Sequence, residues 1–138
     1  MIRTNQKFMS SPIPIKTNAA PDPVGPYNQA IKVGNFVFCS GQIAINPGSN
    51  QIDYLGDIKG ETTQVLKNLK AVLTASGSSL KDVIKTTIFL TDLNNFQIVN
   101  DIYSEFFNNE PTPARACVEV SSLPKGVLIE IDCVAYIH

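Results

Sequence analysis

Residues 127–137 read VLIEIDCVAYI, and this stretch decides the fold class. Every second residue of it, starting with the first, is apolar, whereas Glu130 and Asp132 lie between them. Successive side chains of a β-strand point to opposite faces, so this period of two predicts a strand with one buried and one partly polar face. Residues 114–120, ARACVEV, alternate in the same way and predict a second strand.

The two predicted strands are joined by residues 121–126, and the simplest pairing across so short a connection is an antiparallel hairpin. In the register that places the two strand ends opposite each other, Cys117 faces Glu130 and Arg115 faces Asp132. These side chains then project from one face of the sheet. The apolar alternation resists a slip of one residue, which would move them all to the other face.

The polar face of this predicted hairpin must meet water, a ligand or another subunit, because charged groups are costly to bury in an apolar core. The same face carries Leu128, Val134 and Tyr136, which match a fully solvated surface poorly. We therefore expect an oligomer interface that contains a site.

The rest of the chain supplies further strands and two amphipathic helices. In chain order, the patterns predict an arm or edge strand within residues 10–28, a hairpin of strands 29–33 and 36–40, a loop over 41–54, a helix between Asp57 and Gly77, a strand over 82–91 and a helix over 95–108. The predicted fold class is therefore α+β, with two helices on one face of a mixed sheet. With 138 residues the chain has room for one core, and we predict an N-terminal extension at residues 1–14 followed by a single domain at 15–138.

The composition disfavours a nucleic-acid or membrane partner. The formal net charge is −1 and the sequence pI is about 5.7, so the chain lacks the basic face that a phosphate backbone attracts. No apolar stretch approaches the roughly 20 residues that cross a bilayer. Residues 1–8 are too short and too polar for a secretory signal, so a cytoplasmic location is predicted, with a mitochondrial one as the alternative.

The cysteines and the histidine narrow the chemistry. Cys39, Cys117 and Cys133 are odd in number and widely spaced within apolar runs, which is typical of buried thiols in a reducing compartment rather than of a disulfide framework. His138 is the only histidine, so the chain offers no Ser-His or Cys-His pair and no His-rich metal site. Acid–base chemistry must then fall to carboxylates, tyrosine, lysine, backbone groups or water.

Arg115 is the leading candidate for a functional side chain, because it stands in an otherwise small and apolar stretch. The planar guanidinium binds a carboxylate through two parallel hydrogen bonds, which predicts a clamp for an acidic substrate. An ordinary cross-strand salt bridge with Glu130 or Asp132 explains the same residue without any function. The residues alone leave both interpretations open.

Several separated motifs add to this pattern. They are PDPVGPY at residues 21–27, SGQI at 40–43, VIKTT at 83–87, DLNNF at 92–96 with VN at 99–100, PARACVEV at 113–120, LPK at 123–125 and IEI at 129–131. In this order they resemble the RidA/YjgF family of reactive-intermediate deaminases, and the resemblance extends from about Ile15 to Ile137.

The resemblance implies a chorismate-mutase-like α+β fold that assembles as a homotrimer, with sites in the clefts between subunits. It implies hydrolysis of enamine and imine acids such as 2-aminoacrylate to 2-keto acids and ammonia, without a cofactor or metal. Members of the family have also been described as endoribonucleases and translation inhibitors, which is a second hypothesis. A non-catalytic trimer that binds small carboxylic acids is a third.

Carried over motif by motif, the resemblance implies a role for each of six residues. Arg115 holds the substrate carboxylate and Glu130 positions or activates the attacking water. The substrate-binding residues are Tyr27, Ser40, Asn100 and Cys117, the last through its backbone carbonyl. An arginine beside it should keep Glu130 ionised, so we expect this carboxylate to act as a base.

Three of these residues have equally simple structural explanations. Tyr27 follows Gly25-Pro26 and is able to fasten the N-terminal arm to the sheet. Asn100 fits a polar contact on a helix face, and Ser40 fits a hydrogen bond at a strand end. Their functional assignment rests on the resemblance.

Overall fold

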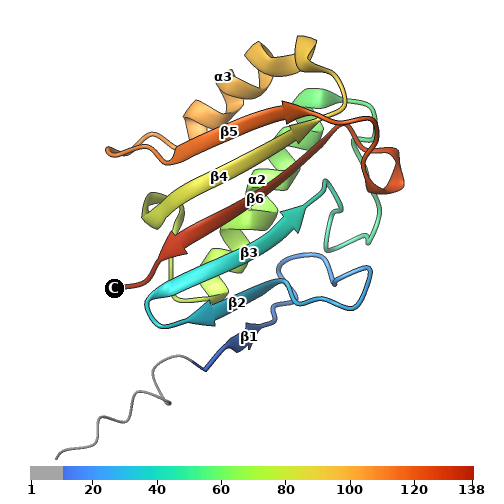
Figure 1. The fold of residues 1–138 in the computed structure, drawn as a ribbon. Helices are drawn as coiled ribbons and strands as arrows, with labels where there is room; N and C mark the ends of the chain where they lie inside the picture. The colour runs from blue at the N-terminus through green and yellow to red at the C-terminus, as the bar shows by residue number, and fades with distance from the viewer. Residues whose placement is uncertain (1–10) are drawn as a thin grey trace, which may run out of the picture.

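The computed structural model describes residues 11–138, which form a six-stranded mixed sheet with two long helices on one face (Figure 1). The strands are β1 (Ile13–Ile15), β2 (Ala30–Val33), β3 (Phe36–Gln42), β4 (Val83–Leu90), β5 (Ala114–Glu119) and β6 (Ile129–Tyr136); the long helices are α2 (Ile58–Ala75) and α3 (Phe96–Phe106); and the short 3₁₀ turns are η1 (Leu80–Asp82), η2 (Leu93–Asn95) and η3 (Pro124–Gly126). The strand order is β1-β2-β3-β6-β4-β5. The predicted α+β class and the placement of both helices on one face are confirmed.

The N-terminal boundary differs from the prediction. Ile13 and Pro14 already pair with β2, so the sheet begins before residue 15. Residues 1–10, with the candidate targeting segment at 1–8, lie outside the described residues.

Local sequence signals explain where the hairpin of β2 and β3 turns and where helix α2 begins and ends. Gly34 adopts a positive φ of 57° in the two-residue turn between β2 and β3, a conformation that glycine takes without strain. Asp57 caps α2 by accepting hydrogen bonds from the N–H groups of Lys59 and Gly60. Gly77, with φ of 81°, follows the end of the same helix. The predicted hairpin and the predicted helix limits are therefore confirmed.

The apolar face of β6 forms the centre of the core. Ile129, Ile131, Cys133 and Ala135 are all buried beneath the helices, while Glu130 lies half-buried on the opposite, open face of the sheet. Burying one isoleucine stabilises the fold by about 1.5–3 kcal/mol, so a register slip of one residue would remove several contributions of this size from the folding free energy. The alternation that predicted this strand therefore also fixes its register.

The predicted hairpin between β5 and β6 is wrong. β4 lies between the two strands: it pairs with β6 in antiparallel orientation and with β5 in parallel orientation. Parallel neighbours need a long crossover, and α3 provides it between β4 and β5. The connection at residues 120–128 then crosses the end of β4, where the Val120 N–H donates to the Leu90 carbonyl.

The predicted shared polar face is wrong for the same reason. Arg115 and Cys117 lie beside Thr86 and Ile88 of β4, whose side chains are buried on the helix-covered face. Arg115 and Cys117 therefore point toward α3, whereas Glu130 projects from the open face. Arg115 does not face Asp132, nor does Cys117 face Glu130.

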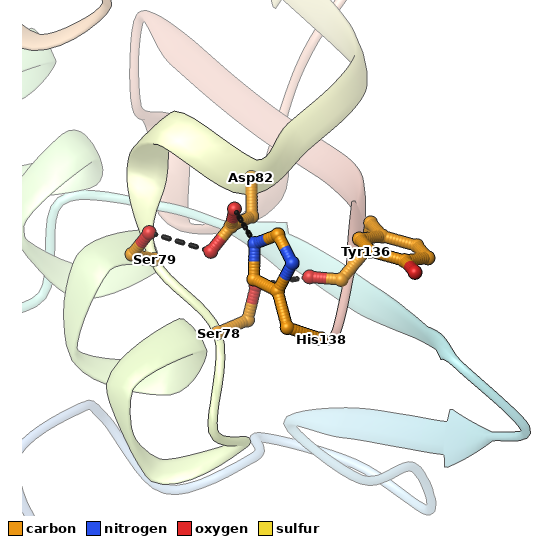
Figure 2. A network of polar contacts seen from close by, with 5 residues as sticks. All are labelled: Ser78, Ser79, Asp82, Tyr136 and His138. Carbon is orange, nitrogen blue, oxygen red and sulfur yellow. Dashed lines mark hydrogen bonds and ion pairs between the residues drawn. The ribbon is translucent and has the colours of Figure 1, made fainter.

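The C-terminal end of β6 is fastened to η1 by a small polar network (Figure 2). His138 Nε2 lies 2.8 Å from Asp82 Oδ1, and the Ser79 hydroxyl donates to the other Asp82 oxygen at 2.8 Å. The Ser78 hydroxyl donates to the Tyr136 carbonyl at 2.8 Å. The only histidine therefore lies just beyond the opposite end of β6 from Glu130, and that end of the strand is about 20 Å from Glu130.

We expect Asp82→Asn to remove an acid-sensitive part of the stability. Burial opposes ionisation, but hydrogen bonds from Ser79 and His138 outweigh it and lower the pKa of Asp82 below its ordinary 3.8. A lowered folded-state pKa stabilises the fold above the unfolded-state pKa, and this contribution is lost as pH falls through the folded-state value. In urea unfolding, the variant should be less stable than wild type by up to about 1 kcal/mol at pH 6 and by less at pH 3, where the contribution of Asp82 begins to be lost. An equal difference at both pH values would contradict this.

Candidate active site

Five of the six candidate residues fall into two groups on opposite faces of the sheet, and Ser40 belongs to neither group. The arginine cluster comprises Arg115, Asn100 and Cys117 with two aromatic neighbours, Phe96 and Tyr103. The glutamate pocket is a hollow of about 410 Å³, including space open to solvent. Its lining comprises Pro21, Asp22, Pro23, Val24, Tyr27, Gln29, Gly41, Gln42, Ile43, Ile45, Pro124 and Glu130.

Arg115 is held by α3 rather than by another strand. Its Nη1 donates a hydrogen bond of 2.7 Å to Asn100 Oδ1. Its guanidinium carbon lies 5.5 Å from the centre of the Phe96 ring and 5.0 Å from the centre of the Tyr103 ring. A cation over an aromatic face at this distance is attracted by the ring, so the two rings and the amide restrict the guanidinium.

The helical period explains why these partners converge. Phe96, Asn100 and Tyr103 are four and three residues apart, which places them on one face of α3. The Tyr103 hydroxyl lies 2.8 Å from Thr86 Oγ1, and Thr86 is fully buried in β4. The aromatic side of the arginine cluster is therefore anchored in the core.

The positive charge of Arg115 has no acidic partner within residues 11–138, where the only ion pair joins His138 and Asp82. The simple salt-bridge interpretation of Arg115 is therefore excluded for this part of the chain. Asn100 is the only hydrogen-bond partner of the guanidinium there, and most of its N–H donors stay available to a planar anion.

Cys117 lies on the same face as Arg115, two residues further along β5 and half-buried at the margin of the core. Burial raises the pKa of its thiol, and the Arg115 charge offsets only part of this effect. The thiol stays protonated at neutral pH, which makes Cys117 a poor nucleophile. Its position beside Arg115 agrees with a role in lining the site.

Glu130 lies in the glutamate pocket, directly against the backbone of β3. A Cβ atom added to Gly41 would lie only 2.6 Å from Glu130 Oε2, so a glycine is required for this approach. Burial raises the pKa of Glu130, and the nearby Asp132 charge raises it further. The expectation that Arg115 keeps this carboxylate ionised is therefore wrong within a single chain, because the arginine lies across the sheet.

Tyr27 and Ser40 both make local structural contacts near the pocket. Tyr27 lines it, is 46% exposed, and accepts a hydrogen bond at its hydroxyl from the Val24 N–H at 3.2 Å. The Ser40 hydroxyl donates to the Asn28 carbonyl at 2.6 Å, and Ser40 is not part of the lining. The strand-end explanation for Ser40 is therefore correct, while Tyr27 both fastens the arm and faces the pocket.

Gln29 organises the arm that forms one wall of the glutamate pocket. Its side chain is buried, accepts a hydrogen bond from the Thr17 N–H at 2.7 Å, and donates to the carbonyls of Thr17, Ala20 and Pro21. One amide side chain thus satisfies four backbone groups of a proline-rich segment that makes few hydrogen bonds of its own. The arm is fixed at the point where it enters the lining.

Within one chain the arginine cluster and the glutamate pocket do not meet. Arg115 and Glu130 are two strands apart across the sheet and three residues apart along it, which corresponds to about 14 Å between their Cα atoms. Their side chains also leave opposite faces. A single chain therefore does not bring the two groups together.

Sequence reasoning missed four residues that shape these groups: Phe96, Tyr103, Gln29 and Gly41. Phe96 and Tyr103 fitted the apolar face of the predicted helix, but their spacing about Asn100 was a usable signal for an arginine clamp. Gln29 and Gly41 gave no comparable signal, because their importance comes from contacts with segments that are distant in sequence.

Within residues 11–138, no group of three histidine, cysteine or acidic side chains is arranged to hold a metal ion. None of the helices in the same part of the chain combines the length and apolarity that spanning a bilayer requires.

Comparison with known proteins identifies the family. The model of the family described as Endoribonuclease L-PSP matches residues 17–137. A RutC family protein of Pyrococcus horikoshii is 57% identical over 122 residues, which cover 88% of this chain and 95% of that protein. A 2-iminobutanoate/2-iminopropanoate deaminase of Dermatophagoides farinae is 44% identical over 124 residues, covering 90% of this chain and 95% of that protein.

The fold comparison agrees. The crystal structure of YyfA from Yersinia pestis, a protein of unknown function of the conserved Rid family, superimposes with a TM-score of 0.89 at 46% identity. The match covers 92% of this chain and all of that one. With the motifs from residue 21 to residue 131, these similarities confirm the resemblance found in the sequence. The chain belongs to the Endoribonuclease L-PSP family, which is the RidA/YjgF family.

Proposed function

We propose that the protein hydrolyses small enamine and imine acids, such as 2-aminoacrylate, to 2-keto acids and ammonia. The observation that carries this proposal is the uncompensated charge of Arg115, which Asn100 and two aromatic rings hold in place. A restrained guanidinium with free donors suits a substrate carboxylate. The deaminase name of the Dermatophagoides farinae relative supports the reaction class.

The complete site, in this proposal, forms between two copies of the chain in a homotrimer. Arg115 and Glu130 leave opposite faces of one sheet, so a substrate bound to Arg115 is out of reach of Glu130 in the same chain. A heterologous contact would place the arginine cluster of one protomer against the glutamate pocket of the next. Phe36, Phe38 and Val118 are exposed large apolar residues of the strands, as an interface requires.

The proposed reaction needs orientation and one proton carrier. An enamine first takes a proton at carbon and gives up a proton from nitrogen, which converts it to the isomeric imine. Water then adds to the C=N carbon while the π electrons move to nitrogen, and the resulting carbinolamine expels ammonia as the carbonyl forms. Fixing the carboxylate and the water in one cleft lowers the entropic part of the barrier by several kcal/mol.

Glu130 is the proposed proton carrier. Its carboxylate accepts a proton from the attacking water and returns it to the departing nitrogen. Burial and Asp132 raise the pKa of Glu130, which brings this group closer to neutral pH and makes the return of the proton easier. The resulting balance is one imine and one water consumed, one 2-keto acid and one ammonia released.

A ribonuclease function, suggested by the family's description, receives less support from the site. The arginine cluster holds one guanidinium, and the net charge of −1 provides no wider basic track for a phosphate backbone. The only histidine lies in the network of Figure 2, away from both groups. RNA cleavage by pure protein that disappears with Glu130→Gln would favour the ribonuclease function.

The proposal is tested by supplying the unstable substrate in place. A pyridoxal-phosphate-dependent dehydratase that releases 2-aminoacrylate is mixed with the purified protein, and keto-acid formation is followed. We expect wild type to accelerate this step above the spontaneous rate. A rate equal to that in buffer, at protein concentrations that preserve the oligomer, would overturn the proposal.

We expect Gly41→Ala to reduce kcat with little loss of stability. The added methyl would lie 2.6 Å from Glu130 Oε2, and the end of this side chain moves away at small energetic cost. The carboxylate is then displaced from its position against β3, so kcat should fall about tenfold or more. Gly48→Ala is the matched control, since its methyl meets only Asn46 Oδ1 at 3.3 Å. Equal kcat values for both variants would contradict the role of Gly41.

We expect Asp132→Asn to move the acidic limb of the pH profile of kcat/KM to lower pH. The Asp132 charge contributes to the raised pKa of Glu130, so its removal lowers that pKa. Glu130 then remains an ionised base down to a more acidic pH, so kcat/KM begins to fall only at a lower pH than in wild type. An acidic limb that is unchanged or moves to higher pH would contradict this assignment.

A further inference from the structure

Cys39 and Cys133 are distant in sequence but directly opposite each other in the sheet, on the antiparallel strands β3 and β6. Both thiols are free, and the side chains are only 7% and 3% exposed. Both belong to the hydrophobic core beneath the helices, so they project from the same face. Their wide spacing in the sequence is typical of unrelated buried thiols, so the sequence did not predict this pairing.

The Cα separation of the pair lies within the range that a disulfide can join. The hydrogen bond from the Ile137 N–H to the Asn35 carbonyl fixes the alternation of the ladder, and it assigns the Cys39–Cys133 pair to the hydrogen-bonded class. Cα atoms of such a pair lie about 5.5 Å apart, and disulfides join Cα atoms that are about 4.4–6.8 Å apart. The Cβ atoms of such a pair lie toward the upper end of about 4.5–5.5 Å, whereas a disulfide needs about 3.5–4.5 Å. Closure therefore requires side-chain rotation and a local approach of β3 and β6 by about 1 Å.

Cys117 is excluded as a partner for either thiol. It lies on β5, beside Ile88 of β4, and β4 separates it from β6. Two strand spacings amount to about 9.6 Å, which exceeds the reach of a disulfide. Among the three pairings that three cysteines allow, the fold therefore permits one.

We propose that Cys39 and Cys133 form an oxidisable dithiol, which closes to an intrachain disulfide in the folded protein and opens again on reduction. The bond would join β3 to β6 next to the bulge between Cys39 and Gln42. β3 continues into Gly41 and β6 carries Glu130, so the link would restrain the two strands that form the glutamate pocket.

The oxidation is balanced with a small organic disulfide as the oxidant. One protein thiolate attacks the reagent and breaks its S–S bond, which releases one thiol and leaves a mixed disulfide. The second protein thiolate attacks that intermediate and releases the second thiol. The protein loses two hydrogen atoms and gains one S–S bond, while the reagent becomes two thiols.

Burial makes this oxidation slow and pH-dependent. The neighbouring Cys39 thiol and burial both raise the pKa of Cys133, so little thiolate exists at neutral pH. The reagent must also enter during local opening of the core. The rate should therefore increase with pH through at least pH 9, and the dithiol should persist in its reduced form in a reducing compartment.

The test uses the full chain with Cys117→Ser, which removes the half-buried third thiol. Folded protein is incubated at pH 8.5 with 2-hydroxyethyl disulfide, unfolded, alkylated and digested for peptide mass spectrometry. We expect linked peptides that contain Cys39 and Cys133, loss of both free thiols, and reversal by dithiothreitol. Because the enclosed loop is long, the thermal midpoint of unfolding should rise by roughly 5–15 °C on oxidation.

The matched control carries Cys39→Ser in addition, and it should show neither the link nor the rise in thermal midpoint. Wild type should give the same Cys39–Cys133 link, with Cys117 left to the reagent. The proposal is overturned if both thiols remain fully alkylatable after prolonged oxidation, if the bond forms only in urea, or if Cys117 is the partner.

Discussion

Arg115→Ala should lower kcat/KM for 2-aminoacrylate by about 10²–10³-fold, because two charge-assisted hydrogen bonds to a carboxylate are worth about 3–4 kcal/mol. The guanidinium makes no ion pair within residues 11–138, so its loss leaves no acidic group buried without a partner there. The thermal midpoint should therefore change little. The measurement is the dehydratase-coupled rate over a range of protein concentrations.

Two variants control for charge and geometry in this experiment. Arg115→Lys keeps the charge but loses the planar fork and its contacts with Phe96 and Tyr103, so we expect an intermediate loss. Lys70→Ala removes an equal charge from the exposed face of α2 and should leave the rate unchanged. A kcat/KM for Arg115→Ala within threefold of wild type would exclude the carboxylate clamp.

Glu130→Gln should lower kcat by about 10²–10⁴-fold with little change in KM, because the amide cannot carry a proton while the carboxylate clamp at Arg115 remains. The substitution preserves the shape of the side chain against Gly41, so folding should be unaffected. Steady-state kinetics in the coupled assay separate kcat from KM.

Asp132→Asn is the matched control, since it removes a carboxylate two residues along the same strand face. It should retain most of the activity at neutral pH while Glu130→Gln does not. A fall in both variants to the same level would show that the summed charge of the face, and not the proton carrier, determines the rate. Substantial activity in Glu130→Gln would contradict the assigned role.

The sequence predicted most elements because their signals are local. The alternation along residues 127–137 requires a buried strand whatever surrounds it, and Asp57 and Gly77 limit α2 through their own backbone contacts. The pairing of β5 could not be predicted in this way. The short connection favoured a hairpin, whereas the crossover through α3 places β4 between the two strands.

The sequence named candidate site residues but did not predict how they are arranged. Arg115 was a candidate from its sequence context, yet the face on which it lies depends on its pairing with Thr86, a long-range contact that alternation alone does not specify. The alanine and valine side chains of β5 have the composition of a buried face. Alternation alone therefore predicted that they face the core and that Arg115 and Cys117 lie on the polar face. Burial by α3 decided between the two faces.

The wrong hairpin between β5 and β6 also explains the wrong expectation for the pKa of Glu130. A hairpin would have placed Arg115 near Glu130 and predicted a carboxylate with a lowered pKa. With the arginine across the sheet, burial and Asp132 determine the pKa of Glu130 and raise it. A neighbouring protomer that supplied its own Arg115 would restore the attraction, so the proposed assembly changes the protonation of the site as well as its shape.

The measurement that tests the central claim most directly is complementation between Arg115→Ala and Glu130→Gln chains. The two inactive variants, carrying different tags, are produced together, and native mass spectrometry confirms that mixed oligomers form. If each site takes Arg115 from one protomer and Glu130 from another, about one quarter of the sites in a random mixture are intact, and roughly that share of wild-type activity should return. Mixed oligomers with no more activity than either variant alone would contradict a site shared between protomers.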